Sequence, residues 1–563
     1  MSERILIGVA WPYANGPLHL GHITGAYLPA DIFARYHRLK GNNVLMVSGS
    51  DQHGTPVTIT AEQESSTPQE VADRYHRQFV DCWAKLGISF DLFTTTHTPN
   101  HFEVARDIFL TLLDKGYIYK DTMLQAYCPE CQRFLPDRYV EGTCPHCAFE
   151  RARGDECDQC GKPMSPTELK GLRCYLCSTP PRFEYSEHFF LRLSAFQDRL
   201  ASWIREQTHW RRNVLGGAWR FLNEGLKDRA ITRDLDWGIP VPQPGFERKR
   251  LYVWFENVIG YLSASKEWAK LQGDDAAWRP FWQGDARSFY FLGKDNIFFH
   301  TLSWPAMLMG YGNLNLPYDV PANEWLTIEG GKLSKSRKWA IWVDDYLARY
   351  DPDALRYTLS VNMPETGDSD FSWREFLRRN NNELVATYGN LAHRVLTFAH
   401  RHFDGIVPPV GEMDEQSQHL LSDAEAALGR VDSLLYRCEF KAAIKEAMSL
   451  AQATNRYIDE QAPWKTIKAE REASARTVYT VLSTLTVLRT MLWPFLPFSS
   501  EKLHAYLGFD GSVQESGWKV EFLPVGQRLR QPEPLFVKLD EAIVAEETSR
   551  LDASLEHQGR ADL

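Results

Sequence analysis

The sequence predicts an α/β protein with a parallel sheet near its N-terminus, a cysteine-rich insertion and a helical C-terminal third. Three observations support this. Strand-like and helix-like segments alternate over residues 1–115, and strand-like segments resume after residue 230. Eight of the ten cysteines fall between residues 128 and 177. In the last third, apolar residues recur at helical spacing.

Length and composition set the limits of the interpretation. With 563 residues, the chain is long enough for three or four domains of roughly 150 residues. A hydrophobic content of 44% and an aromatic content of 13% provide for packed cores, which excludes a disordered chain. The net charge of −10 argues against a protein that binds nucleic acid without regard to sequence, because such proteins neutralise many phosphates.

The sequence predicts no membrane segment. The N-terminal apolar run is about six residues long and lacks a cleavage pattern, so we expect no signal peptide. The most apolar stretch, residues 478–498, contains Arg489, Pro494 and Pro497, whereas a membrane span needs about 20 uninterrupted apolar residues. We therefore expect a core helix that ends at prolines, in a cytoplasmic protein.

The first candidate site is the segment His19-Leu20-Gly21-His22. The apolar run of residues 5–10 predicts a buried strand, and the loop that follows it leads into a helical pattern beginning near His19. A helix N-terminus that follows a parallel strand suits an anion, because free backbone N–H groups point outward there. Two imidazoles can donate to phosphate oxygens, and Gly21 leaves room for a flat ring. The alternative is a pair of helix-capping histidines without a ligand.

The cysteines form four C-x-x-C pairs. Two such pairs complete a four-thiolate zinc site, so four pairs provide for one or two ions. Disulfides are the alternative, but they are rare in large cytosolic chains. The spacing leaves open whether neighbouring pairs combine or whether the inner pairs form one site and the outer pairs another. No ligand position stays open, so we expect structural zinc. The ligands are Cys128, Cys131, Cys144, Cys147, Cys157, Cys160, Cys174 and Cys177.

The second candidate site is the loop "TIEGGKLSKSRKWAI" (residues 327–341). Gly330 and Gly331 make it flexible, while Lys332 and Lys335 make it cationic. Lysines on a mobile loop can follow the charge that develops on a triphosphate as it breaks. Taken alone, such a loop is more often solvated surface.

Two stripes of apolar residues predict a helix bundle in the last third. They are Leu384, Tyr388, Leu391 and Val395, and Phe440, Ile444, Ala447 and Ala451. Asn390 and Arg394 lie four residues apart, off the first stripe, so both can face one ligand. Pro463 breaks a later helix and exposes Trp464. An aromatic plane beside amide and guanidinium donors suits an unstacked base, although a lone tryptophan is more often packing.

At this point the sequence resembles a known family. The segments at His19–His22 and Lys332–Ser336 resemble the HIGH and KMSKS signatures of class I aminoacyl-tRNA synthetases. The family with the same cysteine-rich insertion and other motifs is that of the methionyl-tRNA synthetases, and the resemblance runs from about residue 4 to 540. Leu333 replaces the usual Met of the second signature. The further motifs are "GSDQHGTP" (49–56), "VWFENVIGY" (253–261), "FLGKDNIFFH" (291–300) and "APW" (462–464).

The resemblance implies a doubly wound parallel (Rossmann-type) catalytic domain with a zinc-knuckle insertion, followed by an all-α helix bundle that binds the anticodon. The implied parts are the first half of the catalytic domain (1–117), the insertion (118–230), the second half (231–325), the KMSKS-type loop and stem-contact region (326–380), the anticodon-binding domain (381–540) and a C-terminal tail (541–563).

The resemblance also implies roles for single residues. Asp51 would hold the α-ammonium of methionine, although a turn aspartate would look the same. The wall of the methionine pocket would be Tyr13, Trp254, Tyr261 and His300, with Trp11 beside it, although so many aromatics are often core. Trp11, Asn257, Val258 and Asn296 depart from common family residues. ATP would meet His19, Gly21, His22, Gly293, Asp295, Lys335 and Arg233, with His19, His22, Lys332 and Lys335 as the catalytic set. Asn390, Arg394 and Trp464 would read the CAU anticodon.

The implied activity has two steps. ATP, with Mg²⁺, would activate methionine to methionyl-adenylate and pyrophosphate, and the amino acid would pass to the terminal adenosine of tRNA(Met). One alternative is a class I synthetase for isoleucine, valine, leucine or cysteine, but the 309 residues between His22 and Lys332 leave little room for an editing domain. A more remote alternative is a non-catalytic zinc-containing RNA-binding protein. The chain ends at Leu563 without a further domain, so we expect a monomer.

Overall fold

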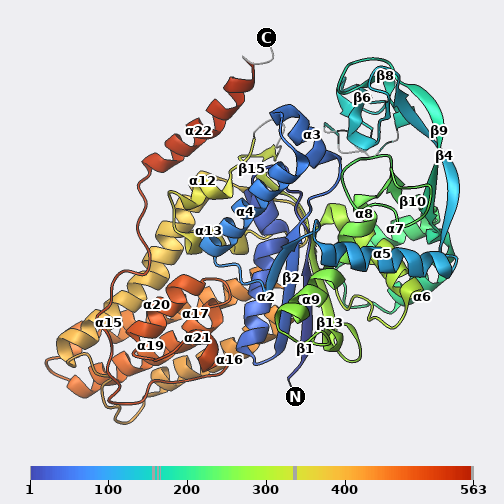
Figure 1. The fold of residues 1–563 in the computed structure, drawn as a ribbon. Helices are drawn as coiled ribbons and strands as arrows, with labels where there is room; N and C mark the ends of the chain where they lie inside the picture. The colour runs from blue at the N-terminus through green and yellow to red at the C-terminus, as the bar shows by residue number, and fades with distance from the viewer. Residues whose placement is uncertain are drawn as a thin grey trace.

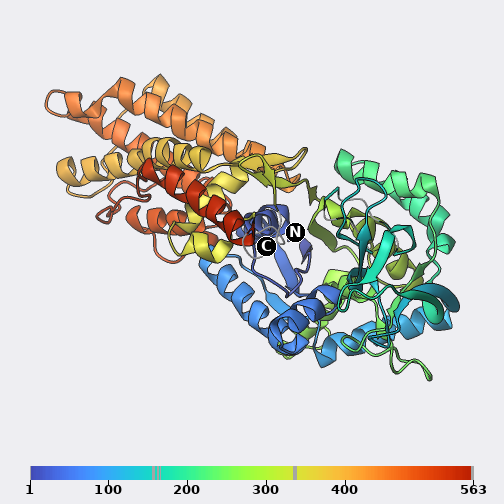
Figure 2. The same cartoon turned by 90° about the horizontal axis from the view of Figure 1, so that it is seen from above.

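The structure is a computed structural model that describes residues 2–154, 157, 159–160, 164, 166–333 and 339–559. A central sheet lies between a β-rich insertion and a bundle of helices (Figure 1). Seen from above, the bundle and the insertion lie at opposite ends of the molecule (Figure 2).

The central sheet has five strands that all run parallel. In spatial order they are β14 (Ala322–Asn323), β13 (Arg287–Gly293), β1 (Arg4–Val9), β2 (Asn43–Ser50) and β3 (Leu92–Thr95). From β1 the chain moves outward through β2 to β3, and it then returns to the other side of β1 as β13 and β14. The order therefore reverses between β1 and β13. In such doubly wound sheets, ligands bind beyond the carboxyl ends of the strands at this switch point. The predicted fold class is confirmed.

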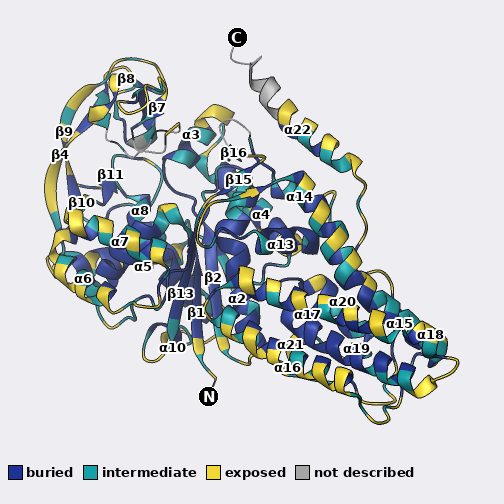
Figure 3. Cartoon of the chain, turned by 180° about the vertical axis from the view of Figure 1, so that it is seen from behind, coloured by how far each residue is buried: buried dark blue, intermediate teal, exposed yellow. Residues whose placement is uncertain are grey.

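The pleat of β1 explains how helices cover both faces of the sheet. Ile5, Ile7 and Val9 belong to the core on one face, while Leu6 belongs to the core on the other. The first face packs against α2 (Leu28–Leu39) and α4 (Pro68–Leu86), and the second packs against α5 (Pro99–Asp114), α9 (Gly260–Leu271) and α11 (Trp304–Tyr311). Both faces are buried, as Figure 3 shows for β1, β2 and β13. This burial explains why the strands appear in the sequence as continuous apolar runs.

The insertion begins with a long antiparallel ribbon, in which β4 (Ile118–Cys128) pairs with β9 (Arg182–Leu191). The sheet of this ribbon also contains β5 (Arg133–Phe134) and β10 (Arg229–Ala230), and a second small sheet contains β7 (Ala152–Arg153), β6 (Val140–Thr143) and β8 (Lys170–Cys174). The ribbon carries the small sheet away from the central one (Figure 1).

Short elements connect the insertion to the second half of the central sheet. They are α6 (Gln197–Arg205), α7 (Arg212–Glu224), β11 (Thr232–Arg233), β12 (Arg250–Leu251), α8 (Val253–Glu256) and α10 (Arg279–Trp282). Two further short helices, α1 (Leu20–His22) and α3 (Thr55–Glu64), follow β1 and β2.

A three-stranded sheet and three helices link the central sheet to the bundle. They are β16 (Gly331–Lys332), β15 (Leu326–Ile328), β17 (Ser369–Phe371), α12 (Val343–Leu347), α13 (Pro352–Val361) and α14 (Trp373–Arg378). The C-terminal helices are α15 (Asn390–His402), α16 (Glu415–Tyr436), α17 (Phe440–Gln461), α18 (Pro463–Thr466), α19 (Arg471–Leu492), α20 (Pro497–Tyr506), α21 (Val513–Ser516) and α22 (Ala542–Gly559). Both predicted apolar stripes are fully buried, which confirms the bundle. No helix in the described part of the chain is long and apolar enough to cross a bilayer.

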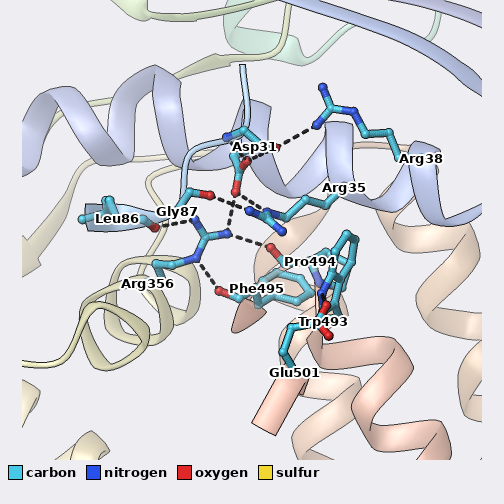
Figure 4. A network of polar contacts seen from close by, with 11 residues as sticks. Asp31, Arg35, Arg38, Leu86, Gly87, Arg356, Trp493, Pro494, Phe495 and Glu501 are labelled. Carbon is cyan, nitrogen blue, oxygen red and sulfur yellow. Dashed lines mark hydrogen bonds and ion pairs between the residues drawn. The ribbon is translucent and has the colours of Figure 1, made fainter. Parts of the chain in front are cut away.

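A buried ion pair lies where the helices beside the central sheet meet the bundle (Figure 4). Arg356 of α13 places its guanidinium 2.7 Å from Asp31 of α2, and both side chains are completely buried. The same guanidinium donates to the carbonyl oxygens of Leu86, Pro494 and Phe495. Three parts of the chain that are distant in sequence therefore meet at Arg356.

Candidate active site

The site lies where the strand order of the central sheet reverses. The carboxyl end of β1 leads to the loop before His19, that of β13 leads to Gly293 and Asp295, and that of β2 leads to Asp51. Ala10, just past β1, donates its N–H to the Phe291 carbonyl of β13 at 3.0 Å. Three of the sequence motifs therefore begin at one edge of one sheet.

The two predicted phosphate-binding segments are in direct contact. The N–H of Leu20 donates to the Ile341 carbonyl at 3.2 Å, and that of Val343 donates to the Leu18 carbonyl at 2.9 Å. A Cβ on Gly21 would lie 2.6 Å from Cδ1 of Leu333, so the leucine side chain packs directly over this glycine and would have to move for any larger residue. These contacts join His19–His22 to both ends of the loop. Lys335 lies outside the described residues.

The two histidines form a compact pair. Their ring centroids are 3.7 Å apart, and the backbone N–H of His19 donates to Nδ1 of His22 at 3.1 Å. Because Nδ1 of His22 accepts, a neutral His22 ring carries its proton on Nε2, where it can donate to a ligand. Both side chains are half-buried at the mouth of the site.

Asp51 is a buried carboxylate at the carboxyl end of β2. Its Oδ2 accepts from Asn257 Nδ2 at 2.6 Å, and its Oδ1 accepts from the His53 backbone N–H at 3.1 Å. In the described part of the chain, no lysine or arginine forms an ion pair with it. Burial, followed by the nearby Glu256 carboxylate, raises the pKa of Asp51. A cationic ligand group would reverse this shift.

Behind Asp51 lies a polar cluster that the sequence interpretation missed. The buried Glu256 contacts His53 Nδ1 at 2.8 Å and His101 Nε2 at 2.7 Å, and His53 Nε2 lies 2.9 Å from His97 Nδ1. Burial alone would raise the pKa of Glu256, but the two histidines outweigh it and lower that pKa. Glu256 stands inside the quoted "VWFENVIGY" motif, so its place in the motif was the available signal.

Tyr13 connects Asp51 to the predicted aromatic residues. Tyr13 pairs with Asp51 through a short backbone bridge, and its ring lies edge-on to Trp254 at 6.3 Å. Trp254 stacks on Phe299 at 4.3 Å, a partner that the sequence interpretation did not single out. The structure therefore brings Tyr13, Trp254 and Asp51 together.

Tyr261 and His300, two further residues predicted to line the methionine pocket, form a separate buried pair. The His300 ring meets the Asn296 carbonyl through Nδ1 at 2.9 Å, so Nδ1 carries the proton. Nε2 then accepts from the Tyr261 hydroxyl at 2.8 Å. Burial lowers the pKa of His300 to about 4, so the ring is neutral at pH 7. The pair is an uncharged, hydrogen-bonded surface.

Trp11 is closely packed against two glycines. A Cβ on Gly49 would lie 2.2 Å from the indole, and one on Gly260 would lie 2.7 Å from it. The ring therefore lies between β2 and the start of α9, with a small exposed fraction of 7%. Its role in the pocket stays a prediction.

The predicted nucleotide-binding residues that remain to be placed form two groups, one around Trp325 and one at Tyr252. Asp295, after β13, accepts a hydrogen bond from Trp325 Nε1 at 3.0 Å, and the Lys332 ammonium lies 4.4 Å from the same indole ring. Arg233 of β11 lies 3.6 Å from the ring of Tyr252, which immediately precedes α8.

The helix bundle has a cleft of about 680 Å³. It is lined by Ala386, Thr387, Asn390, His393, Arg394, Gln452, Asn455, Arg456 and Asp459. Arg394 donates to Asp459 at 2.9 Å, and its guanidinium lies 5.3 Å from the Trp464 ring, which is 42% exposed. The three residues predicted to read a base therefore lie on or beside one polar cleft.

The eight cysteines of the insertion form two separate groups. One contains Cys128, Cys131, Cys174 and Cys177, and the other contains Cys144, Cys147, Cys157 and Cys160. In each group the four Sγ atoms lie within 4.8 Å of one another, and the Sγ–Sγ distances Cys128–Cys177, Cys131–Cys174, Cys144–Cys160 and Cys147–Cys157 are 3.4–3.9 Å. Zn–S bonds of 2.3 Å in a tetrahedron put sulfurs about 3.8 Å apart, so both groups fit zinc. Of the two combinations left open by the sequence, the structure shows the second: the two inner C-x-x-C pairs form one group and the two outer pairs form the other.

Comparison with known families covers nearly the whole chain. Residues 5–396 match the family described as tRNA synthetases class I (M), and residues 407–555 match the anticodon binding domain of methionyl tRNA ligase.

Relatives and solved structures agree with this match. The chain is 62% identical over 551 residues to the methionine–tRNA ligase of Dehalococcoides mccartyi, covering 98% of this chain and 100% of the relative. It is 52% identical to that of Thermomicrobium roseum, covering 98% and 99%. The structure resembles Mycobacterium tuberculosis methionyl-tRNA synthetase in complex with methionyl-adenylate, with a TM-score of 0.80 and 26% identity over 95% of this chain and 100% of that one.

Proposed function

The chain belongs to the methionyl group of class I tRNA synthetases, and we propose from this that its site performs both steps of a methionine–tRNA ligase. In the first step the carboxylate of methionine attacks the α-phosphate of ATP, and pyrophosphate leaves. In the second, a hydroxyl of the terminal adenosine of tRNA(Met) takes the methionyl group and AMP leaves.

One observation carries the proposal: the contact between His19–His22 and the ends of the KLSKS loop. A histidine-containing segment and a lysine-rich loop about three hundred residues apart are held together by backbone hydrogen bonds and by Leu333 against Gly21. This arrangement supports a triphosphate that lies between them, with His19, His22, Lys332 and Lys335 as the donors. Stabilising the charge that develops on the transferred phosphate is the largest catalytic contribution of such groups. We also propose that Gly21, Gly293, Asp295 and Arg233 bind the nucleotide and that Mg²⁺ accompanies it.

For methionine, we propose that Asp51 binds the α-ammonium group. This buried carboxylate has a raised pKa, and among the described residues its hydrogen-bond donors are two neutral groups. The α-ammonium of methionine would supply the missing positive charge. Tyr13, Trp254, Tyr261, His300 and Trp11 would then surround the thioether side chain. The neutral His300–Tyr261 pair favours an uncharged side chain, and aromatic rings contact sulfur favourably.

For tRNA, we propose that Asn390, Arg394 and Trp464 read the CAU anticodon. The exposed indole beside the Arg394 guanidinium suits a base that stacks on one group and accepts hydrogen bonds from the other. The two cysteine groups would hold structural zinc and stabilise the small sheet of the insertion. We further propose that the chain acts as a monomer in the cytoplasm.

The test is methionine-dependent exchange between ATP and pyrophosphate. We expect exchange with methionine and none with isoleucine, valine, leucine or cysteine. His22→Ala should lower the rate about 10²-fold, the effect of losing one donor to the transition state. His419→Ala is the control, because that exposed histidine lies on the bundle and pairs with Asp423 at its surface. Near-normal exchange in His22→Ala would refute the phosphate role.

The anticodon proposal is tested separately in the same protein. Trp464→Ala should leave methionine-dependent exchange unchanged and lower the charging of tRNA(Met). If Trp464→Ala charges tRNA at the normal rate, the indole does not bind the anticodon.

A further inference from the structure

Trp325 lies at a junction between two of the sequence motifs. Its indole carries two lysine ammonium groups over the ring, that of Lys294 at 3.9 Å and that of Lys332 at 4.4 Å. Lys294 belongs to the "LGKD" segment after β13, and Lys332 is the first residue of the KLSKS loop. A cation at this distance from an indole is attracted to the face of the ring. Trp325 is 36% exposed and lies in the short connection between β14 and β15.

The edge of the same indole holds a third group. Nε1 of Trp325 donates to Oδ2 of Asp295 at 3.0 Å. An indole N–H is a donor only, so its partner must be an acceptor, here one oxygen of a carboxylate. The bond occupies Oδ2 and fixes the plane of the carboxylate, while Oδ1 stays available to accept from a ligand hydroxyl.

The backbone of Trp325 is itself fixed. Its N–H donates to Asp368 at 2.9 Å, and its carbonyl accepts from the N–H of Ser369 at 3.0 Å. Lys294 is held in turn by Asp368 at 2.8 Å and by Glu324 at 2.7 Å. The indole is therefore anchored at its backbone, which allows it to orient the groups that touch its ring.

We propose that Trp325 is a positioning residue for recognition of the ribose of ATP. Its N–H holds the Asp295 carboxylate in the orientation that accepts a ribose hydroxyl, and its face holds Lys332 at the base of the KLSKS loop. The inference rests on the proposed function, in which Asp295 meets the ribose. It adds the residue that orients this carboxylate and links it to the loop.

The two contacts of the ring are separable by substitution. Trp325→Phe keeps an aromatic face for Lys332 and removes the N–H, so Asp295 loses its orientation. We expect kcat/KM for ATP to fall about tenfold, mainly through KM, the usual size for a hydrogen bond to a charged group. Trp325→Leu also removes the aromatic face, so kcat should fall further. KM for methionine should not change in either variant.

The experiment measures ATP–pyrophosphate exchange with ATP, 2′-deoxyATP and 3′-deoxyATP. The loss caused by Trp325→Phe should disappear with the analogue that lacks the hydroxyl bound by Asp295. A general structural defect would lower the rates with all three nucleotides alike. Trp278→Phe is the matched control, because the Trp278 ring also carries two cations, Lys266 at 5.1 Å and Arg279 at 5.2 Å, in the connection between α9 and α10. That variant should behave like the parent chain.

The variant Asp295→Asn distinguishes a failure of the positioning inference from a failure of the proposed function. If Asp295→Asn lowers the rate with ATP more than with one of the deoxy analogues, while Trp325→Phe lowers all three rates equally or none, the positioning inference is wrong and the proposed function stands. If Asp295→Asn lowers the rates with all three nucleotides equally or not at all, Asp295 does not bind the ribose, and that part of the proposed function fails together with the inference.

Discussion

Two buried aspartates, one at the junction with the helix bundle and one at the edge of the central sheet, have opposite surroundings. Asp31 accepts from Arg35 and Arg356 at Oδ2 and from the N–H and hydroxyl of Ser89 at Oδ1. Asp51 accepts only from an amide and a backbone N–H. The protein itself compensates the first charge, whereas the second has no countercharge among the described residues.

The pKa shifts of the two carboxyls follow from this difference. Burial alone would raise the pKa of Asp31, but Arg35 and Arg356 outweigh it and lower the pKa to about 2. At Asp51, burial and the neighbouring Glu256 both raise the pKa. Removing a partner from a fully compensated buried charge destabilises the fold, while a buried carboxylate without a cation is a candidate for pairing with a cationic ligand group.

Breaking the compensated region should have the largest effect. Arg356→Leu leaves Asp31 buried with one cation fewer, which costs about 3–5 kcal/mol for a buried pair. We expect a large fall in the midpoint of thermal unfolding. Arg38→Leu is the control. Arg38 lies on α2, the helix of Asp31, and its ion pair with Asp91 lies nearer the surface and contributes about 1 kcal/mol or less. Equal shifts in the two variants would contradict the special role of Arg356.

Removing the charge of Asp51 should affect binding and not folding. Asp51→Asn keeps the shape and loses the charge that pairs with the α-ammonium, so kcat/KM for methionine should fall about 10²-fold, a loss of about 3 kcal/mol. The midpoint of thermal unfolding should stay the same or rise, because a desolvated carboxylate has been removed. Asp31→Asn should lower the midpoint of thermal unfolding and leave kcat/KM for methionine unchanged. A clear loss of stability in Asp51→Asn would mean that this charge is structural.

Acidification should separate the two regions. The folded-state pKa of Asp31 lies below its unfolded value, so its contribution, about 2 kcal/mol, is present above pH 4 and is lost as the pH falls through about 2. The pKa of Asp51 is raised, so this group takes up its proton first. KM for methionine should therefore rise on acidification before the thermal midpoint falls. A KM that stays constant down to the pH of unfolding would contradict this order.

The smallest effect concerns one hydrogen bond to Asp51. Asn257→Ala removes the donor at Oδ2 and should raise KM for methionine about fivefold, roughly 1 kcal/mol. In an Asp51→Asn background the same substitution should have little further effect, because the two residues act through one contact. Additive losses in the double variant would show that Asn257 acts elsewhere.

Much of the site was predictable because short motifs follow strands directly. His19–His22 comes after one predicted strand and Asp51 after another, and parallel strands end at the same edge of a sheet. The two apolar stripes of the bundle were predictable for a similar reason, since helical spacing puts their residues on one face. In each case the local pattern determines the direction in which the side chains point.

Contacts between distant segments were not predictable. Glu256, His53 and His101 lie in three separate segments, and no spacing within any one of them indicates that they meet. The same holds for Trp325, whose partners come from two motifs. The pairing of the cysteines was open because each C-x-x-C turn forms from local residues. Its spacing does not specify which second turn shares the same ion.

The sequence by itself determined the fold class, the thiolates available for metal and the residues that begin at the carboxyl ends of the strands, because strand and helix periodicities act over a few residues. Only the tertiary structure decided which cysteine pairs combine, that Leu333 lies against Gly21, and that Asp31 has its cations while Asp51 has none among the described residues. These features depend on how distant segments pack, and the free energy of a buried charge is set by every group around it.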